Sequence, residues 1–163
     1  MPSNVAIFGA AGQLGSELVR EFRLRGHRVQ EFDRTRVDIT DAAQVEQVVA
    51  QARPELVINA AAYNQVDVAE REPQAAFLVN ALAVRHFAVA CRQWDIRLTH
   101  FSTDYVFDGR TDRPYTEDDP THPLGAYAVS KLAGELYAQA YLETPLIIRT
   151  SGVFGPRGRH TAR

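Results

Sequence analysis

Short apolar runs rich in β-branched residues alternate along the chain with longer segments in which apolar residues recur every three or four positions. The short runs predict buried strands, and the longer segments predict helices with one apolar face. Strands are expected at 5–8, 28–32, 56–58, 97–101 and 146–148. Helices are expected at 13–25, 41–52, 73–92 and 126–141. Thr40 or Asp41 is the expected N-cap of the second helix.

Strands that alternate with helices are typical of βαβ units, in which helical crossovers join parallel strands. The order therefore predicts an α/β fold with a doubly wound parallel sheet of the Rossmann type. The length of 163 residues favours one domain, which we expect over 1–155. Residues 156–163 are polar, basic and without periodicity, and they predict an unstructured tail. The polar loop over 103–123 is long for a connection, which favours a binding or lid role.

Composition and charge narrow the class of protein. The net charge of −2 argues against general electrostatic binding to nucleic acid or to an anionic membrane. No apolar run approaches the roughly 20 residues that span a bilayer, and the N-terminus lacks the pattern of a signal peptide. Cys91 is the single cysteine, so no internal disulfide is expected, and the five histidines show no metal-ligand spacing. We therefore expect a cytoplasmic protein without a metal site.

Three glycines in the pattern Gly9-x-x-Gly12-x-x-Gly15 stand between the first predicted strand and the first helix. Glycines at such a turn let a ligand approach the backbone, and the helix N-terminus presents free N–H groups to a pyrophosphate. The spacing differs from the common Gly-x-Gly-x-x-Gly and suggests a variant Rossmann group; a plain turn between strand and helix is the alternative. The predicted phosphate site consists of Gly9, Gly12, Gln13, Leu14 and Gly15.

Charged residues after the second strand bear on whether the chain prefers NADH or NADPH. Asp33 stands where an acidic residue binds the adenosine ribose, which favours NADH, whereas Arg34 offers a cation for the 2′-phosphate of NADPH. An ordinary charged turn is the alternative for this pair. Asp38 and Ile39 come later and are candidates to approach the adenine, although helix capping explains them equally well.

Small side chains follow the third strand at Ala60, Ala61 and Ala62. Ligands of open α/β sheets bind at the carboxyl ends of the strands. Small residues there let backbone and dinucleotide come close, and tight packing is the alternative reading. We expect all three alanines to contact the dinucleotide.

Tyr127 and Lys131 lie four residues apart on a predicted helix and therefore share one face. A free tyrosine, with a pKa of about 10, is a poor base at neutral pH. A neighbouring ammonium stabilises the phenolate and brings its pKa toward the working range. Together with the hydroxyl of Thr103, these side chains predict a proton relay that reduces a carbonyl or oxidises an alcohol.

Longer motifs resemble the extended short-chain dehydrogenase/reductase family over almost the whole chain. The resemblance rests on Gly12-Gln-Leu-Gly15, Asn59-Ala-Ala-Ala-Tyr63, Val79-Asn80-Ala81, Ser102-Thr-Asp-Tyr-Val-Phe-Asp-Gly109 and Ser130-Lys-Leu-Ala-Gly-Glu135. It is closest to members that reduce the C4 keto group of dTDP-4-dehydro-L-rhamnose to dTDP-L-rhamnose with NADPH or NADH. The resemblance therefore implies a nucleotide-sugar oxidoreductase.

The resemblance also implies residue roles. Tyr127 would protonate the C4 oxygen as hydride arrives, and Lys131 would lower the pKa of that tyrosine and bind the nicotinamide ribose. Thr103 would hydrogen-bond the reacting oxygen, and Asp104 and Tyr105 are candidates to contact the substrate. Asn80 resembles a helical asparagine that supports a proton relay in related enzymes.

Two departures from the family pattern leave alternatives open. In this family a second portion builds much of the sugar-nucleotide site, so we expect a dinucleotide-binding half that lacks most of the C-terminal substrate portion. Gly152 stands where the family commonly carries a tryptophan near the sugar. The alternatives are another nucleotide-sugar reductase or epimerase, or a non-catalytic NADP-binding regulatory subunit. A homodimer is a possible assembly.

Overall fold

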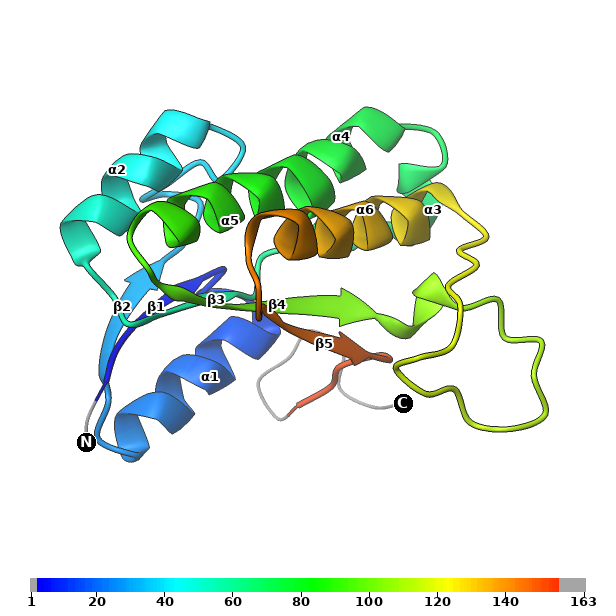
Figure 1. Cartoon of the computed structure of the whole chain (residues 1–163), viewed down its shortest axis with the longest axis horizontal. Helices are drawn as coiled ribbons and strands as arrows, with labels where there is room; N and C mark the ends of the chain where they lie inside the picture. Colours follow the sequence, from blue (N-terminus) through cyan, green and yellow to red (C-terminus); the bar gives the residue numbers. More distant parts are fainter. Residues whose placement is uncertain (1–2, 156–163) are drawn as a thin grey trace.

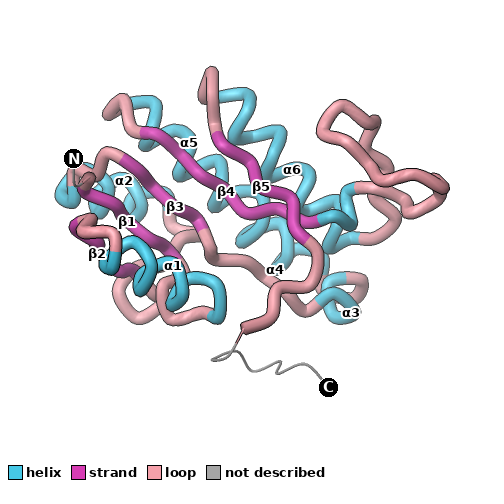
Figure 2. Tube along the Cα trace, turned by 90° about the horizontal axis from the view of Figure 1, so that it is seen from below, coloured by secondary structure: helices cyan, strands magenta, loops and turns pink. Residues whose placement is uncertain are grey.

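The computed structural model describes residues 3–155, so the tail predicted for 156–163 lies outside the described residues. Its centre is one five-stranded sheet in the order β2-β1-β3-β4-β5, with every neighbouring pair parallel (Figure 2). The strands are β1 (Asn4–Phe8), β2 (Arg28–Phe32), β3 (Leu56–Asn59), β4 (Arg97–Thr103) and β5 (Leu146–Thr150). The doubly wound parallel sheet is thereby confirmed.

Helices cover both faces of this sheet. They are α1 (Gln13–Leu24), α2 (Ala42–Ala52), α3 (Val66–Ala69), α4 (Pro73–Phe77), α5 (Ala83–Gln93) and α6 (Ala126–Tyr141). A π-helical segment, η1 (Leu78–Leu82), joins α4 to α5, and a 3₁₀ turn, η2 (Asp104–Val106), follows β4. Figure 1 shows α2, α5 and α6 on one face of the sheet and α1 on the other.

Alternating residues of β1 pack into two separate cores, one on each face of the sheet. Ala6 and Phe8 of β1 join the core under α2, α5 and α6, where the Phe8 ring lies 4.5 Å from that of Phe87. Val5 and Ile7 point to the opposite face and join the core under α1. Parallel strands with both faces covered read as continuous apolar runs, which is why this strand is evident in the sequence.

The sheet has its topological switch point between β1 and β3, where the strand order reverses. The chain moves from β1 to β2 on one side, and then returns to place β3 on the other side. In doubly wound proteins, ligands bind at the carboxyl ends of the strands, in the crevice beside this switch point. The turn after β1 and the turn after β3 meet there, and the sequence places the three glycines and the three alanines in these turns.

The expected strands are confirmed to within two residues at their ends, and Asp41 is the N-cap of α2, accepting bonds from the N–H groups of Ala43 and Gln44. The prediction of one continuous α-helix over 73–92 is wrong in its middle, because residues 78–82 form the π-helical segment η1. The short elements α3 and η2 were not expected. They are too short to produce an apolar period.

The π-helical segment lies where two helices approach closely. A Cβ at Gly134 of α6 would stand 2.2 Å from the carbonyl oxygen of Asn80, so only glycine fits there. π-bulges often occur at functional sites because they re-aim a side chain. Here the bulge carries Asn80, whose side chain is buried between α6 and the turn after β3.

Within residues 3–155, one helical run, Pro73–Gln93, is long and apolar enough by length and composition to cross a membrane. The apolar runs of the sequence indicate no segment of that length. Half of its most apolar stretch is buried inside the fold. Because the run packs against α2 and α6, it serves here as a core helix of the domain.

Gly134→Ala is expected to lower the free energy of unfolding by about 1–3 kcal/mol, the usual cost of an overpacked core. The clash with the Asn80 carbonyl should exceed the gain of up to about 1 kcal/mol that alanine brings to a helix interior. Urea denaturation measures the difference.

Gly152→Ala is the matched control for this substitution, because nothing lies within 4 Å of an added Cβ there. Equal stability of the Gly134→Ala protein and the parent would show that α6 can move away from η1 without cost.

Candidate active site

The turn after β1 is shaped by backbone packing. Gly9 has a φ of 78°, and a Cβ there would stand 2.6 Å from the backbone nitrogen of Ala61. A Cβ at Gly15 would stand 2.1 Å from the carbonyl oxygen of Gly9. Both glycines are therefore required by the contact between this turn, α1 and the turn after β3.

Gly12 has a different task, since it is the N-cap of α1. No side chain caps this helix end, and its first turn contains no acidic residue. The N–H groups of the first turn, over 13–15, are thus open to an external acceptor. Together with the partial positive charge of the helix end, they fit an anionic phosphate. The structure places Gly9, Gly12, Gln13, Leu14 and Gly15 together at this turn, as expected.

Gln13 makes a contact that the sequence did not indicate. Its side-chain amide donates a hydrogen bond of 2.9 Å to the carbonyl oxygen of Val153. The segment after β5 is thereby held against the turn that follows β1, and it borders the same crevice.

The turn after β3 is held by buried polar groups. The Asn59 side-chain oxygen accepts a bond of 3.1 Å from the Ala61 N–H, and its amide nitrogen lies 3.2 Å from Nδ1 of His100. Burial is the main cause that holds the pKa of His100 well below its usual value, with the charge of Lys131 adding to it. The imidazole is therefore neutral, and the turn that carries Ala60, Ala61 and Ala62 is held in place by Asn59 and packs against Gly9.

Asp33 and Arg34 follow β2 at the same edge of the sheet. One carboxylate oxygen of Asp33 accepts bonds of 2.9 and 2.6 Å from the N–H and hydroxyl of Thr35, which lower the pKa of Asp33. Arg34 is exposed. Asp33 therefore takes part in an ordered charged turn, and the exposed Arg34 lies next to it.

Asp38 and Ile39 are explained largely by local structure. Asp38 accepts bonds of 2.9 and 2.7 Å from the N–H and hydroxyl of Thr40. Ile39 packs against the core under α2 and α5. Turn formation and packing account for both side chains, whereas helix capping, the alternative that the sequence offered, is performed by Asp41.

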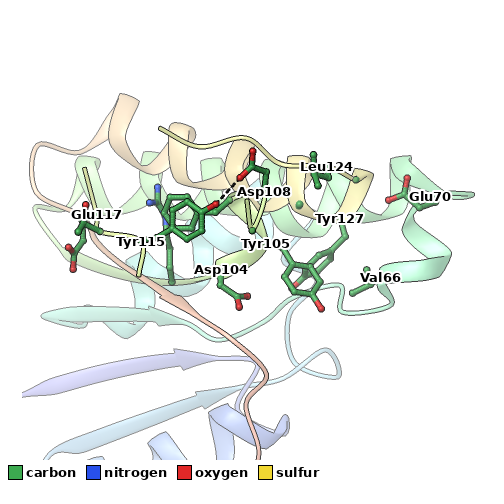
Figure 3. Close-up of a pocket in the computed structure, with 15 residues that line it drawn as sticks. Val66, Glu70, Asp104, Tyr105, Asp108, Tyr115, Glu117, Leu124 and Tyr127 are labelled. Carbon is green, nitrogen blue, oxygen red and sulfur yellow. Dashed lines mark hydrogen bonds between the residues drawn. The ribbon is translucent and has the colours of Figure 1, made fainter. Parts of the chain in front are cut away.

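Thr103 and Tyr127 meet at the carboxyl end of β4. The Thr103 hydroxyl accepts a bond of 3.2 Å from the Tyr105 N–H and donates one of 3.2 Å to the Asp104 carboxylate. The Tyr105 and Tyr127 rings make an edge-to-face contact, with centroids 6.1 Å apart. Figure 3 shows Asp104, Tyr105 and Tyr127 on one side of a cavity. The structure therefore brings together the residues predicted for proton transfer and for substrate contact.

Lys131 lies one helical turn after Tyr127 and is 2% exposed. Its Nζ donates a bond of 2.6 Å to the carbonyl oxygen of Phe101 in β4. Burial lowers the pKa of Lys131 to about 8, against a smaller raising effect from the Glu135 carboxylate. The ammonium is thus anchored to the sheet below Thr103.

The sequence predicts that Lys131 lowers the pKa of Tyr127, and the structure shows the opposite direction. Burial raises the pKa of Tyr127, and a hydrogen-bonding contribution from Thr103 offsets only part of it. The physical reason is that burial disfavours the charged phenolate. The phenol stays protonated at neutral pH, and such a group can donate a proton.

Asn80 links the turn after β3 to α6, the helix that carries Tyr127 and Lys131. Its side-chain oxygen accepts a bond of 2.8 Å from the Tyr63 N–H, and its nitrogen donates to the Tyr63 carbonyl and to the Ser130 hydroxyl at 3.1 and 3.0 Å. Ser130 in turn donates a bond of 2.7 Å to the Tyr127 carbonyl. Asn80 thus fixes the turn after β3 against α6.

A cavity of about 800 Å³ opens beside Tyr127, between η2, the start of α6 and the loop that follows β4. The loop is ordered by its own contacts: the Phe107 and Tyr115 rings stack at 4.3 Å, and the Tyr115 hydroxyl donates a bond of 2.7 Å to Asp108. Figure 3 shows Tyr115, Asp108 and Glu117 across the cavity from Tyr127. The loop is therefore a wall of the cavity, in accord with the binding role expected for it.

The sequence did not indicate the ion pair that supports this wall. Glu135 of α6 is 1% exposed and accepts a bond of 2.7 Å from the guanidinium of Arg149 in β5. The same guanidinium lies 5.1 Å from the centre of the Phe107 ring. Glu135 ends a motif quoted above, but nothing in that motif points to Arg149, which the packing of α6 on β4 and the pairing of β4 with β5 bring beside it. Within the part of the chain that the structure describes, no group of side chains has the arrangement of a metal site.

The fold and this site are those of the extended short-chain dehydrogenase/reductase superfamily. Within it, the chain belongs to the family described as the RmlD substrate binding domain, whose model matches residues 3–163.

Two curated relatives are named dTDP-4-dehydrorhamnose reductase. The Streptomyces griseus protein is 44% identical over 153 residues, which are 93% of this chain and 50% of that protein. The Escherichia coli protein is 40% identical over 98% of this chain and 54% of its own length. The chain thus spans about half the length of these relatives.

A solved structure of dTDP-4-dehydrorhamnose reductase from Bacillus anthracis, in complex with NADP, is similar with a TM-score of 0.94 and 39% identity. The match covers 98% of this chain and 57% of that one. The similarity therefore extends over the whole sheet and the site at its edge.

Lys131 is the only lysine of the sequence, so its titration can be measured without ambiguity. In protein labelled with ¹³Cε-lysine, we expect the midpoint near pH 8, because burial disfavours the ammonium. An unfolded lysine titrates near 10.4. Between these values the unfolded state binds more protons, so the free energy of unfolding should rise with pH.

Lys131→Met removes this contribution and serves as the control. The stability of the parent relative to Lys131→Met, measured by urea denaturation, should rise between pH 8 and about 10.4. A midpoint above 10 would contradict the burial of the ammonium.

Proposed function

We propose that this chain is the dinucleotide-binding half of an oxidoreductase that reduces the C4 keto group of dTDP-4-dehydro-L-rhamnose to dTDP-L-rhamnose. One observation carries the proposal. Thr103 and Tyr127 come together at the carboxyl end of β4, the strand to which the Lys131 ammonium is hydrogen-bonded at Phe101. The relatives named dTDP-4-dehydrorhamnose reductase support the substrate, and the presence of Thr103, Tyr127 and Lys131 supports the reaction class.

The residues at the switch point fit a nicotinamide dinucleotide. The uncapped first turn of α1 would hold the pyrophosphate, and Asp33 or Arg34 would bind the adenosine ribose or its 2′-phosphate. Ala60, Ala61 and Ala62 would let the dinucleotide lie close to the turn after β3. When bound, NADPH or NADH supplies the hydride.

The chain's own groups would handle the proton. Tyr127 holds a proton on its phenol oxygen, because burial raises its pKa. From there it would donate the proton to the C4 oxygen of the sugar, while the Thr103 hydroxyl orients that oxygen. Lys131 would keep a positive charge beneath them and contact the nicotinamide ribose. Asp104 and Tyr105, which border the cavity, would contact the substrate.

Calorimetric titration with NADPH and NADH tests the dinucleotide site. Arg34→Ala is expected to weaken NADPH about 10-fold or more, since a hydrogen bond to a charged group contributes about 1.5–3 kcal/mol. NADH, which lacks the 2′-phosphate, should change by less than about twofold. Asp33→Ala is the matched variant, with the larger loss expected for NADH. Equal losses for both dinucleotides in Arg34→Ala would contradict this assignment.

Tyr127→Phe is expected to keep NADPH affinity within about twofold and to lower turnover of the dTDP-linked keto sugar by at least about 100-fold, the scale of general acid catalysis. NADPH absorbance with product chromatography measures the rate and identifies the sugar. Tyr137→Phe, on the same helix, is the control. Unchanged turnover in Tyr127→Phe would remove the phenol from the reaction. A different product from the parent would favour another nucleotide-sugar reductase or an epimerase.

A further inference from the structure

The helix that carries Tyr127 and Lys131 begins without a cap of its own. Its N-cap is Gly125, which has extended backbone angles and no side chain to accept a bond. The first N–H groups of a helix have no intrahelical acceptor, and an unsatisfied end frays. Tyr127 lies in this first turn, so its position depends on whatever holds the helix end.

A carboxylate from a distant part of the sequence supplies the missing acceptor. Glu70, at the end of α3, accepts a hydrogen bond of 2.6 Å from the Ala126 N–H, across 56 residues of chain. A carboxylate at a helix N-terminus is also favoured by the helix dipole. The bond is thus charge-assisted and fixes the first turn of α6 against α3.

Gly125 lies against the same carboxylate. A Cβ at residue 125 would stand 2.6 Å from the same Glu70 oxygen. Gly125 has a φ of −147°, a value that any residue adopts, so backbone conformation does not require glycine there. The space that a side chain would fill is occupied by the carboxylate of Glu70.

Both residues border the cavity beside Tyr127 (Figure 3). We propose that Glu70 is a positioning residue for Tyr127, which caps α6 from outside and so sets the place of the phenol beside Thr103. The inference rests on the proposed role of Tyr127 as the proton donor. In this proposal the short helix α3, through Glu70 at its end, holds the first turn of α6 and with it the Tyr127 phenol.

The test measures the pKa of the Tyr127 phenol directly and needs no enzymatic turnover. In protein labelled with ¹³Cζ-tyrosine, the Tyr127 signal is assigned by its loss in Tyr127→Phe, and its pKa is read from a pH titration. Glu70→Ala should bring this pKa down toward the ordinary value of about 10, because a frayed turn exposes the phenol to water. It should also lower the Tm by about 2–4 °C, the scale of one lost cap.

Two variants separate positioning from general loss of stability. Glu70→Gln keeps an oxygen acceptor and should retain the parent pKa of Tyr127. Gly125→Ser in the Glu70→Ala background gives α6 a local N-cap, with space freed by the missing carboxylate, and should restore both the pKa and the Tm. Glu72→Ala removes a nearby exposed carboxylate that lies outside the cavity lining, and it should change neither.

A parent-like Tyr127 pKa in folded Glu70→Ala protein would overturn the proposal. So would a failure of Gly125→Ser to restore the pKa when it restores the Tm, since the cap would then act on stability alone. The titration needs no substrate, so its result stands apart from the reaction. If Tyr127 responds to Glu70 but Tyr127→Phe keeps full turnover, the proposed function fails and the positioning role survives.

Discussion

The hydrogen bond from the Lys131 ammonium to the Phe101 carbonyl is the constraint on which the site depends. Removing an ammonium from water is costly, and the shift of its pKa to about 8 shows that burial weakens the charged form. The apolar packing of α6 against β4 and α5 must offset this cost. Any change that lets water reach Lys131 would therefore also loosen Tyr127, one helical turn away.

Close backbone approach is the second requirement, and glycine provides it at two separate contacts. Gly134 lets α6 meet η1 at the Asn80 carbonyl, and Gly15 lets α1 meet the turn after β1. The first contact orients the helix with the phenol, and the second aims the N–H groups of α1 into the crevice. A Cβ at either position would separate elements whose ends must face one ligand.

Sequence patterns predict the sheet and the phosphate turn because both depend on local order: apolar runs for strands, and glycines between strand and helix. The same patterns bring Thr103, Tyr127 and Lys131 to one edge, since parallel strands end there together. They do not predict Glu70 or the Glu135–Arg149 pair, whose partners lie far apart along the chain. They also miss η1, because the helical period of 73–92 continues through the bulge.

The direction of the two pKa shifts bears on the chemistry that the site favours. Burial raises the pKa of Tyr127 and lowers that of Lys131, so the phenol keeps its proton to higher pH while the ammonium gives up its proton at lower pH. Lys131 is the single lysine among the 18 lysine and arginine residues of the sequence, and the rest are arginines. An arginine at residue 131 would stay fully charged and would need several acceptors for its guanidinium, whereas a compact ammonium is satisfied by one carbonyl and remains adjustable. A lysine therefore suits this buried position, where a guanidinium would leave donors without acceptors.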